Sequence, residues 1–212
     1  MITLYEPLRG KQLLTLLNSR ASSNEILFHG ISILADVFVF VYPILLLFLF
    51  FRGYSSKNKS MQFYSISILL STAIAVWINI LIQFFIWKER PETLQWLKLI
   101  LKHVPSISFP SDHAAVSMAF AIGFIMSMKL LLPKSYRNRS YFLITASLIM
   151  GICRVAVAVH RPTDILIWWI IGIIWGYTGY TLSNTKTVQK LIYWLISISN
   201  TIIGHILPQK HV

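Results

Sequence analysis

Long apolar stretches separated by short polar loops dominate the chain. Five of them approach or exceed the roughly twenty residues that a helix needs to cross a bilayer. They lie at about 26–51, 61–87, 114–132, 141–159 and 164–182. None alternates strictly like a membrane barrel strand, and helices satisfy their own backbone hydrogen bonds in lipid. The pattern predicts one all-α integral membrane domain over 1–212, a bundle of five to six transmembrane helices.

The remaining segments are less apolar. Residues 1–24 mix basic side chains with leucines and are too short and too charged to span, which predicts an interfacial helix. The tail at 188–208 leaves two alternatives open, a sixth span at 191–206 or a surface-lying helix, because polar residues interrupt it. Apolar residues at helical spacing between 94 and 101 predict another short helix on the membrane surface.

Charge patterning indicates how the bundle is oriented. The chain is 56% hydrophobic and 12% charged, with a formal net charge of +12. Its basic residues lie in short loops rather than in one patch, so membrane orientation explains them better than nucleic acid does. Two loops carry basic residues without acidic ones: Arg52, Lys57 and Lys59, and then Lys134, Arg137 and Arg139. We expect both loops to be cytoplasmic and the acidic residues to lie at or towards the outer face.

Side chains able to do chemistry fall in three short groups, at 88–91, 109–113 and 153–164. If the third predicted span crosses the membrane and the fourth returns, these groups meet at one face. We therefore expect His113 and His160 on the same, outward side of the membrane.

Arginine in two of the groups is suited to holding a phosphate. Arg90 and Arg154 would converge at the outer ends of the second and fourth spans, and a guanidinium fork matches phosphate oxygens. Lys88 is either a helper in phosphate binding or an anchor that snorkels towards headgroups. An ionisable residue within the first span, Asp36, should face protein or water, as a structural contact or near the substrate. Cys153 is the only cysteine, so no intramolecular disulfide is possible.

The second group opens the third span. Ser111 can cap this helix, whose free N–H groups form an anion site, although capping alone would explain it. His113 beside it can donate a proton to a leaving oxygen near neutral pH.

The third group pairs a histidine with a carboxylate. His160 and Asp164 are four residues apart, and Pro162 between them suits the first helical position. A carboxylate on one ring nitrogen would leave the other unprotonated and nucleophilic. A structural pairing is the alternative.

Together the three groups resemble the type 2 phosphatidic acid phosphatase superfamily. Its pattern is Lys-x6-Arg-Pro, Pro-Ser-Gly-His and Ser-Arg-x5-His-x3-Asp. Here the matching residues, in order and spacing, are Arg90-Pro91, Pro110-Ser111-x-His113 and Arg154-x5-His160-x3-Asp164.

Three positions depart from that pattern. Gln83 stands where the first lysine is expected, so that contact is missing or is made by Lys88. Cys153 replaces the serine before Arg154. Asp112 replaces the glycine, and its carboxylate would repel an anionic substrate unless it is paired with a base or turned to the headgroups. The resulting Pro-Ser-Asp-His is similar to the bacitracin-resistance branch, the bacterial undecaprenyl pyrophosphate phosphatases.

The resemblance implies an activity and a role for each residue. It implies a metal-independent phosphatase without cofactors, acting through a phosphohistidine on a polyprenyl diphosphate at the outer face of a bacterial cell membrane. His160 would attack phosphorus, Asp164 would orient it, and His113 would protonate the leaving oxygen. The phosphate would be held by Arg90, Ser111 and Arg154, with help from Lys88.

Other interpretations stay open. The substrate could be another lipid phosphate, such as phosphatidylglycerol phosphate or a lipid A phosphate. A polytopic transporter without hydrolysis is an alternative of a different class. Ser111 could replace His160 as nucleophile. The two histidines with Asp112 and Asp164 could form a metal site, although neighbouring arginines would oppose a cation.

Overall fold

The structure is a computed structural model that describes residues 2–3, 6–88, 90–91, 97–98, 111–131 and 140–206. Its helices are α1 (Leu8–Ser22), α2 (Glu25–Asp36), α3 (Val41–Ser55), α4 (Lys59–Gln83), α5 (Asp112–Leu131), α7 (Phe142–Ala156), α8 (Pro162–Ser183) and α9 (Lys186–Ile206), with a 3-10 turn η1 (Phe38–Phe40). Two short strands, β1 (Ile2–Thr3) and β2 (Ile86–Trp87), complete the described elements. The predicted surface helix at 94–101 and the basic loop with Lys134, Arg137 and Arg139 lie almost wholly outside the described residues.

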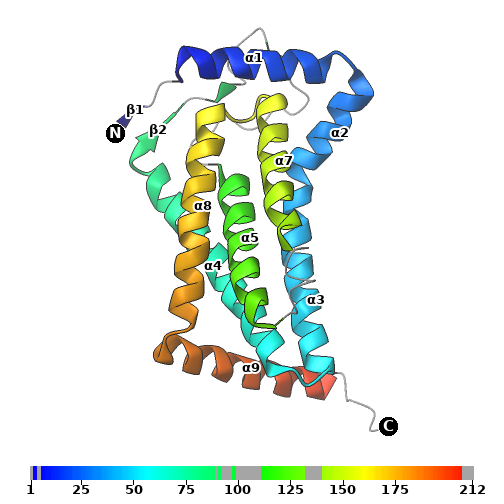
Figure 1. The fold of residues 1–212 in the computed structure, drawn as a ribbon, viewed down its shortest axis with the longest axis vertical. Helices are drawn as coiled ribbons and strands as arrows, with labels where there is room; N and C mark the ends of the chain where they lie inside the picture. The colour runs from blue at the N-terminus through cyan, green and yellow to red at the C-terminus, as the bar shows by residue number, and fades with distance from the viewer. Residues whose placement is uncertain are drawn as a thin grey trace.

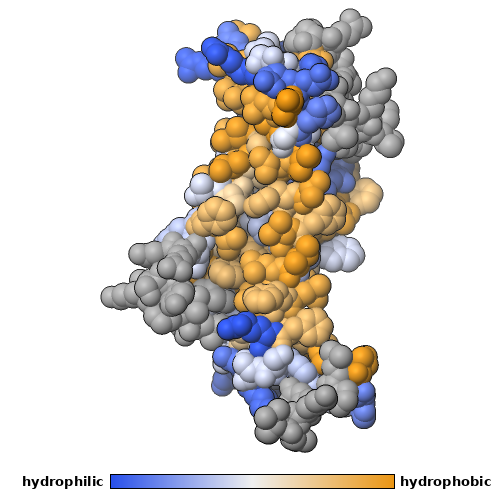
Figure 2. Space-filling model, turned by 90° about the vertical axis from the view of Figure 1, so that its right-hand side faces the viewer, coloured by the Kyte–Doolittle hydropathy of each residue, from blue (hydrophilic) through white to orange (hydrophobic). Residues whose placement is uncertain are grey.

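The helices form a bundle closed at both ends by a crossing helix. Helices α2, α3, α4, α5, α7 and α8 run along its long axis, α1 lies across one end and α9 lies across the other (Figure 1). Among the described residues, three stretches are long and apolar enough to cross a membrane: Glu25–Ser55, Lys59–Gln83 and Pro162–Ser183, with shorter apolar stretches in α5 and α7. On the face drawn in Figure 2, an apolar band crosses the middle of the molecule, with hydrophilic side chains towards both ends. The predicted all-α membrane bundle is therefore confirmed.

The two terminal helices both lie across the bundle. Helix α1 crosses one end, the orientation expected of an interfacial helix at 1–24. Helix α9 crosses the other end (Figure 1), which favours the surface-lying alternative; its position relative to the membrane stays a prediction. Ile192 and Ile196 of α9 are buried against Phe63 of α4. Gln62 and Asn200 add a reciprocal pair of amide hydrogen bonds of 2.6 and 3.1 Å.

The first predicted span is interrupted where its acidic residue lies. Helix α2 is capped by Asn24, whose side chain accepts a hydrogen bond from the N–H of Leu27, and it ends at Asp36. The η1 turn then leads into α3. The change from α-helix to 3-10 turn after Asp36 changes the direction of the backbone. It leaves the Ala35 carbonyl available to accept a hydrogen bond from another helix. That carbonyl is used by the candidate site.

The second predicted span is shorter than expected. Helix α4 begins after Asn58, which caps it through the N–H of Met61, and it ends at Gln83. The predicted end at residue 87 is wrong, because Ile86 and Trp87 are extended and pair in parallel with β1. This pairing brings the start of the chain beside the segment that leads into the first reactive group.

Small residues let α8 lie close to α5. A Cβ atom on Gly172 would lie 2.8 Å from the carbonyl oxygen of Ala115, and one on Gly176 would lie 2.7 Å from that of Ala119. Glycine on the contact face allows two membrane helices to approach this closely. The approach sets the distance between the starts of α5 and α8, where the second and third reactive groups lie.

Candidate active site

The three reactive groups meet at the end of the bundle that α1 covers. Ala114 and Ala115 at the start of α5 belong to one buried cluster with Val155 near the end of α7 and Ile165 in the first turn of α8. Leu14 of α1 belongs to the same cluster. The residues expected to act together are thus on one side of the bundle, as the order of the spans predicts.

Arg154 is buried in the last turn of α7, with 3% of its surface exposed. Its Nη1 donates 2.8 Å hydrogen bonds to the Ala35 carbonyl and to Oδ1 of Asp36. Asp36 thus supplies the countercharge that a buried guanidinium needs. The charges of Arg90 and Asp112 also act on it. Arg154 Nε is buried and has no hydrogen-bond partner among the described residues.

His160 lies on a reversal of the chain directly after α7. Ala158 has a positive φ of 61°, and the Arg154 carbonyl accepts hydrogen bonds from the N–H groups of Val159 and His160 at 3.1 and 3.4 Å. This left-handed helix end folds the chain back over the last turn. It explains the spacing of the motif, because His160 Nε2 comes to 3.4 Å from Arg154 Nη2.

Arg90 approaches the same reversal from the other side. Its Nη1 donates a 3.3 Å hydrogen bond to the Val159 carbonyl. Arg90 is partly exposed, whereas His160 is only 3% exposed. Two guanidinium groups therefore flank the segment that carries the imidazole.

Asp164 is fully buried in the first turn of α8. The helix begins with Pro162 in its first turn, as predicted, and Asp164 Oδ2 accepts a 3.0 Å hydrogen bond from the N–H of Arg161. Asp164 Oδ1 lies 2.6 Å from Nζ of Lys88. The carboxylate is therefore held both by the helix start and by a buried ammonium.

Lys88 is not a snorkelling anchor, because it is 3% exposed. Besides Asp164, its Nζ contacts Glu6 Oε2 at 2.9 Å and Thr163 Oγ1 at 2.5 Å. An ammonium group has three donors, and these three acceptors match them in number. Lys88 therefore lies against the carboxylates of the site.

Ser111 and His113 stand at the start of α5. The Ser111 carbonyl accepts the first helical hydrogen bond, from the N–H of Ala115 at 3.1 Å. Its hydroxyl is buried and makes no capping or other hydrogen bond to the described residues. His113 is half-buried in the first turn. Unfilled donors at a helix start are suited to an anion.

The departure at Asp112 is accommodated by α4. Asn79 Nδ2 donates a 2.6 Å hydrogen bond to Asp112 Oδ1. Sequence reasoning missed Asn79, although an amide within an apolar span was a usable signal; in the structure it is fully buried. It also gave no role to Thr163, which lies within the third group, and it missed Glu6, for which no local pattern pointed to the site.

Within the ranges that the structure describes, no three His, Cys, Asp or Glu side chains are arranged to hold a metal ion. The donor groups that lie beside His160 and its neighbour Val159 are the guanidinium groups of Arg154 and Arg90. This set matches the oxygens of a phosphate rather than a cation.

A membrane helix bundle with arginine, histidine and carboxylate side chains gathered at one end fits a class of membrane phosphatase. The PAP2 superfamily model matches residues 64–187, more than half of the chain, and the protein belongs to this superfamily. It is a membrane lipid phosphatase.

Two relatives are informative. Undecaprenyl-diphosphatase BcrC of Bacillus subtilis (strain 168) is 27% identical over 166 residues, covering 74% of this chain and 78% of BcrC. The crystal structure of Aquifex aeolicus LpxE has a TM-score of 0.62 at 20% identity, covering 85% of this chain and 99% of LpxE. The second likeness extends the shared fold to almost the whole of LpxE.

Proposed function

We propose that the enzyme hydrolyses undecaprenyl diphosphate to undecaprenyl phosphate and inorganic phosphate. The likeness to BcrC supports this substrate. The observation that carries the chemistry is the 3.4 Å separation of Arg154 Nη2 from His160 Nε2 in a buried setting. A neutral imidazole whose Nε2 faces this guanidinium can act as a nucleophile. The same guanidinium can hold a phosphate against that nitrogen.

The reaction proceeds in two displacements. His160 Nε2 attacks the terminal phosphorus, and the bond from that phosphorus to the bridging oxygen breaks. His113 gives a proton to the departing oxygen, and the product is the lipid monophosphate. His113 then takes a proton from water, which attacks the phosphohistidine and releases inorganic phosphate.

Other side chains orient and stabilise the reacting groups. Asp164 orients His160. Arg154 Nε and the Ser111 hydroxyl, both buried and unfilled among the described residues, serve as donors to the equatorial oxygens, together with Arg90. Fixed donors of this kind stabilise the charge that develops in phosphoryl transfer. The lipid tail stays in hydrocarbon while only the headgroup enters.

The site faces the outside of a bacterial cell membrane in this proposal. The opposite end of the bundle carries Arg52, Lys57, Lys59, Lys186 and Lys190 in short connections and at the start of α9. Basic residues next to spans favour the cytoplasmic side. The single domain of 1–212 would thus return the monophosphate carrier at the outer leaflet.

The test is release of inorganic phosphate from undecaprenyl diphosphate by detergent-purified protein with a chelator present. Native protein should turn over, and His160→Ala should lose several orders of magnitude, because the nucleophile is gone. His29→Ala, which changes an exposed histidine on α2, is the matched control and should keep native turnover.

Each alternative has its own outcome. A strong preference for phosphatidylglycerol phosphate or a lipid A phosphate would overturn the substrate. Substrate passage without phosphate release, retained in His160→Ala, would identify a transporter. An acid-labile phosphoenzyme supports His160, whereas an acid-stable one would assign the attack to Ser111. Loss of turnover with the chelator would require a metal.

A further inference from the structure

Lys88 bridges two carboxylates inside the protein. Glu6 and Asp164 both contact its Nζ, at 2.9 and 2.6 Å, and both side chains are fully buried. Two buried carboxylates on one ammonium repel each other once that ammonium is removed. The position of Asp164 therefore depends on Lys88, and that of Lys88 depends on Glu6.

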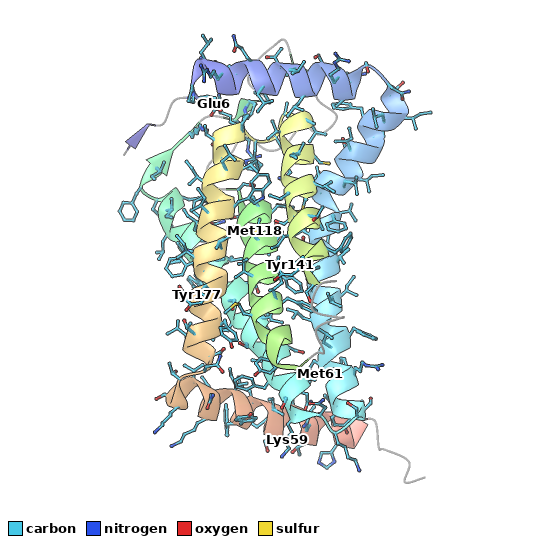
Figure 3. All side chains as sticks on the ribbon, in the orientation of Figure 1. Glu6, Lys59, Met61, Met118, Tyr141 and Tyr177 are labelled. Atoms are coloured by element: carbon cyan, nitrogen blue, oxygen red, sulfur yellow. The ribbon has the colours of Figure 1, made fainter. Side chains whose placement is uncertain are left out.

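Glu6 reaches this site through the start of the chain. The parallel pairing of Ile2 with Ile86 and of Thr3 with Trp87 aligns the first residues with the segment that ends at Lys88. Glu6 also accepts hydrogen bonds from the N–H and the hydroxyl of Thr163. Figure 3 shows Glu6 beside the start of α8, at the opposite end of the bundle from Lys59.

The first turns of α1 are shaped around this carboxylate. A Cβ atom on Gly10 would lie 2.0 Å from Glu6 Oε1. Glycine inside a helix is unfavourable, and here it leaves the space that the folded-back Glu6 side chain occupies. Gly10 is therefore a second, independent indication that the position of Glu6 matters.

We propose that Glu6 and Lys88 are positioning residues of the phosphatase: Glu6 holds Lys88, and Lys88 holds Asp164 in the place from which it orients His160. The inference rests on the proposed function, which gives Asp164 that role. It makes the segment before α1 part of the active centre. It also gives Lys88 the role of binding the two carboxylates instead of binding the phosphate directly.

Three possible roles of Lys88 predict changes in different measured quantities: kcat, KM or the melting temperature. If Lys88 acts through Asp164 and His160, its loss slows the chemical step and leaves substrate binding nearly intact. If Lys88 only stabilised the fold, its loss would lower the melting temperature without changing kcat of the folded fraction. A direct phosphate ligand would chiefly raise KM.

The first experiment measures kcat and KM for Lys88→Met, Lys88→Arg and Glu6→Gln. We expect kcat to fall about 10- to 100-fold in Lys88→Met, as for residues that act through another group, with KM changed less than about threefold. Lys88→Arg should recover part of the loss. Glu6→Gln should lower kcat less, and it should add little in the Lys88→Met background. Exposed residues at the same end provide the controls Lys11→Met and Glu25→Gln, which should match native protein.

The second experiment changes no charge. Gly10→Ala should lower kcat by displacing Glu6, whereas Gly30→Ala, where a Cβ would meet nothing within 4 Å, should leave it unchanged. Equal kcat in native protein, Gly10→Ala and Lys88→Met would overturn the inference.

A third measurement separates this inference from the choice of substrate. Orthovanadate, an analogue of the transferring phosphoryl group, should raise the melting temperature of native protein, with an affinity at least about tenfold weaker in Lys88→Met. If native protein binds vanadate more tightly than Lys88→Met but does not hydrolyse undecaprenyl diphosphate, only the proposed substrate is wrong. Normal hydrolysis with equal vanadate affinity in both proteins would overturn the inference alone. Failure of native protein to bind vanadate would overturn both.

Discussion

Asn79 of α4 donates a 2.6 Å hydrogen bond to Asp112, the carboxylate that replaces a glycine in the family pattern. The bond turns one carboxylate oxygen towards α4. An amide from a neighbouring span thus offsets part of the repulsion that an acidic residue would exert on an anionic substrate.

Asn79→Ala should therefore weaken substrate binding. A hydrogen bond to a charged group contributes about 1.5–3 kcal/mol, so we expect kcat/KM to fall about tenfold or more, mostly through KM. Asp112→Gly, which restores the family residue, should remove most of this loss in the double variant. Asn200→Ala removes an amide from the far end and should not change KM. Steady-state kinetics on native protein, the two single variants, the double variant and Asn200→Ala checks the prediction, and equal losses with and without Asp112 would contradict it.

Asp36 should matter because of Arg154. Asp36→Ala leaves a buried guanidinium with only the Ala35 carbonyl on that nitrogen, so the free energy of unfolding should fall by about 1–3 kcal/mol. Turnover should fall as well, since Arg154 is then free to turn away from His160. Asp36→Asn, which keeps an acceptor, should retain more of both. Thermal unfolding and phosphate release measure the two effects; no change in either would show that the ion pair is dispensable.

A bulkier side chain between α5 and α8 should push these two helices apart, and with them the second and third reactive groups at their starts. Gly176→Val inserts carbon atoms where even a Cβ would lie 2.7 Å from the Ala119 carbonyl. Overpacking of this kind costs about 1–3 kcal/mol. We expect a lower melting temperature and a lower kcat in the folded protein. Gly204→Ala on α9, whose Cβ would meet only Tyr54 at 3.5 Å, is the control and should behave like native protein.

The orientation of α9 can be tested by chemical labelling. Lys186→Cys and His205→Cys place thiols at its two exposed ends. Both should react with an impermeable maleimide from the same side of sealed vesicles, because α9 lies across the bundle end. Cys153, the only native cysteine, is buried and serves as the low-labelling background. Labelling of the two ends from opposite sides would show that α9 is a sixth span.

Much of the architecture follows from local pattern. Apolar length predicts the spans, because lipid requires each of them to satisfy its own backbone hydrogen bonds. Proline at position 162 and a carboxylate at 164 predict the start of α8 for the same local reason. Fold class and the gathering of the reactive groups at one end were therefore accessible from the sequence.

Long-range contacts decided the rest. Spacing in the chain says nothing about which partner fills a buried donor, and Glu6 and Lys88 are 82 residues apart along the chain. The same holds for Asp36 with Arg154 and for Asn79 with Asp112. Local hydropathy alone also left α9 undecided, because its place depends on docking against α4.

The sequence by itself thus determined the membrane helices and the residue types that can bind and attack a phosphate, since both depend on local chemistry. Only the tertiary structure decided which charged side chains pair with one another. A buried ion needs a specific partner, and that partner is chosen by how the helices pack in three dimensions.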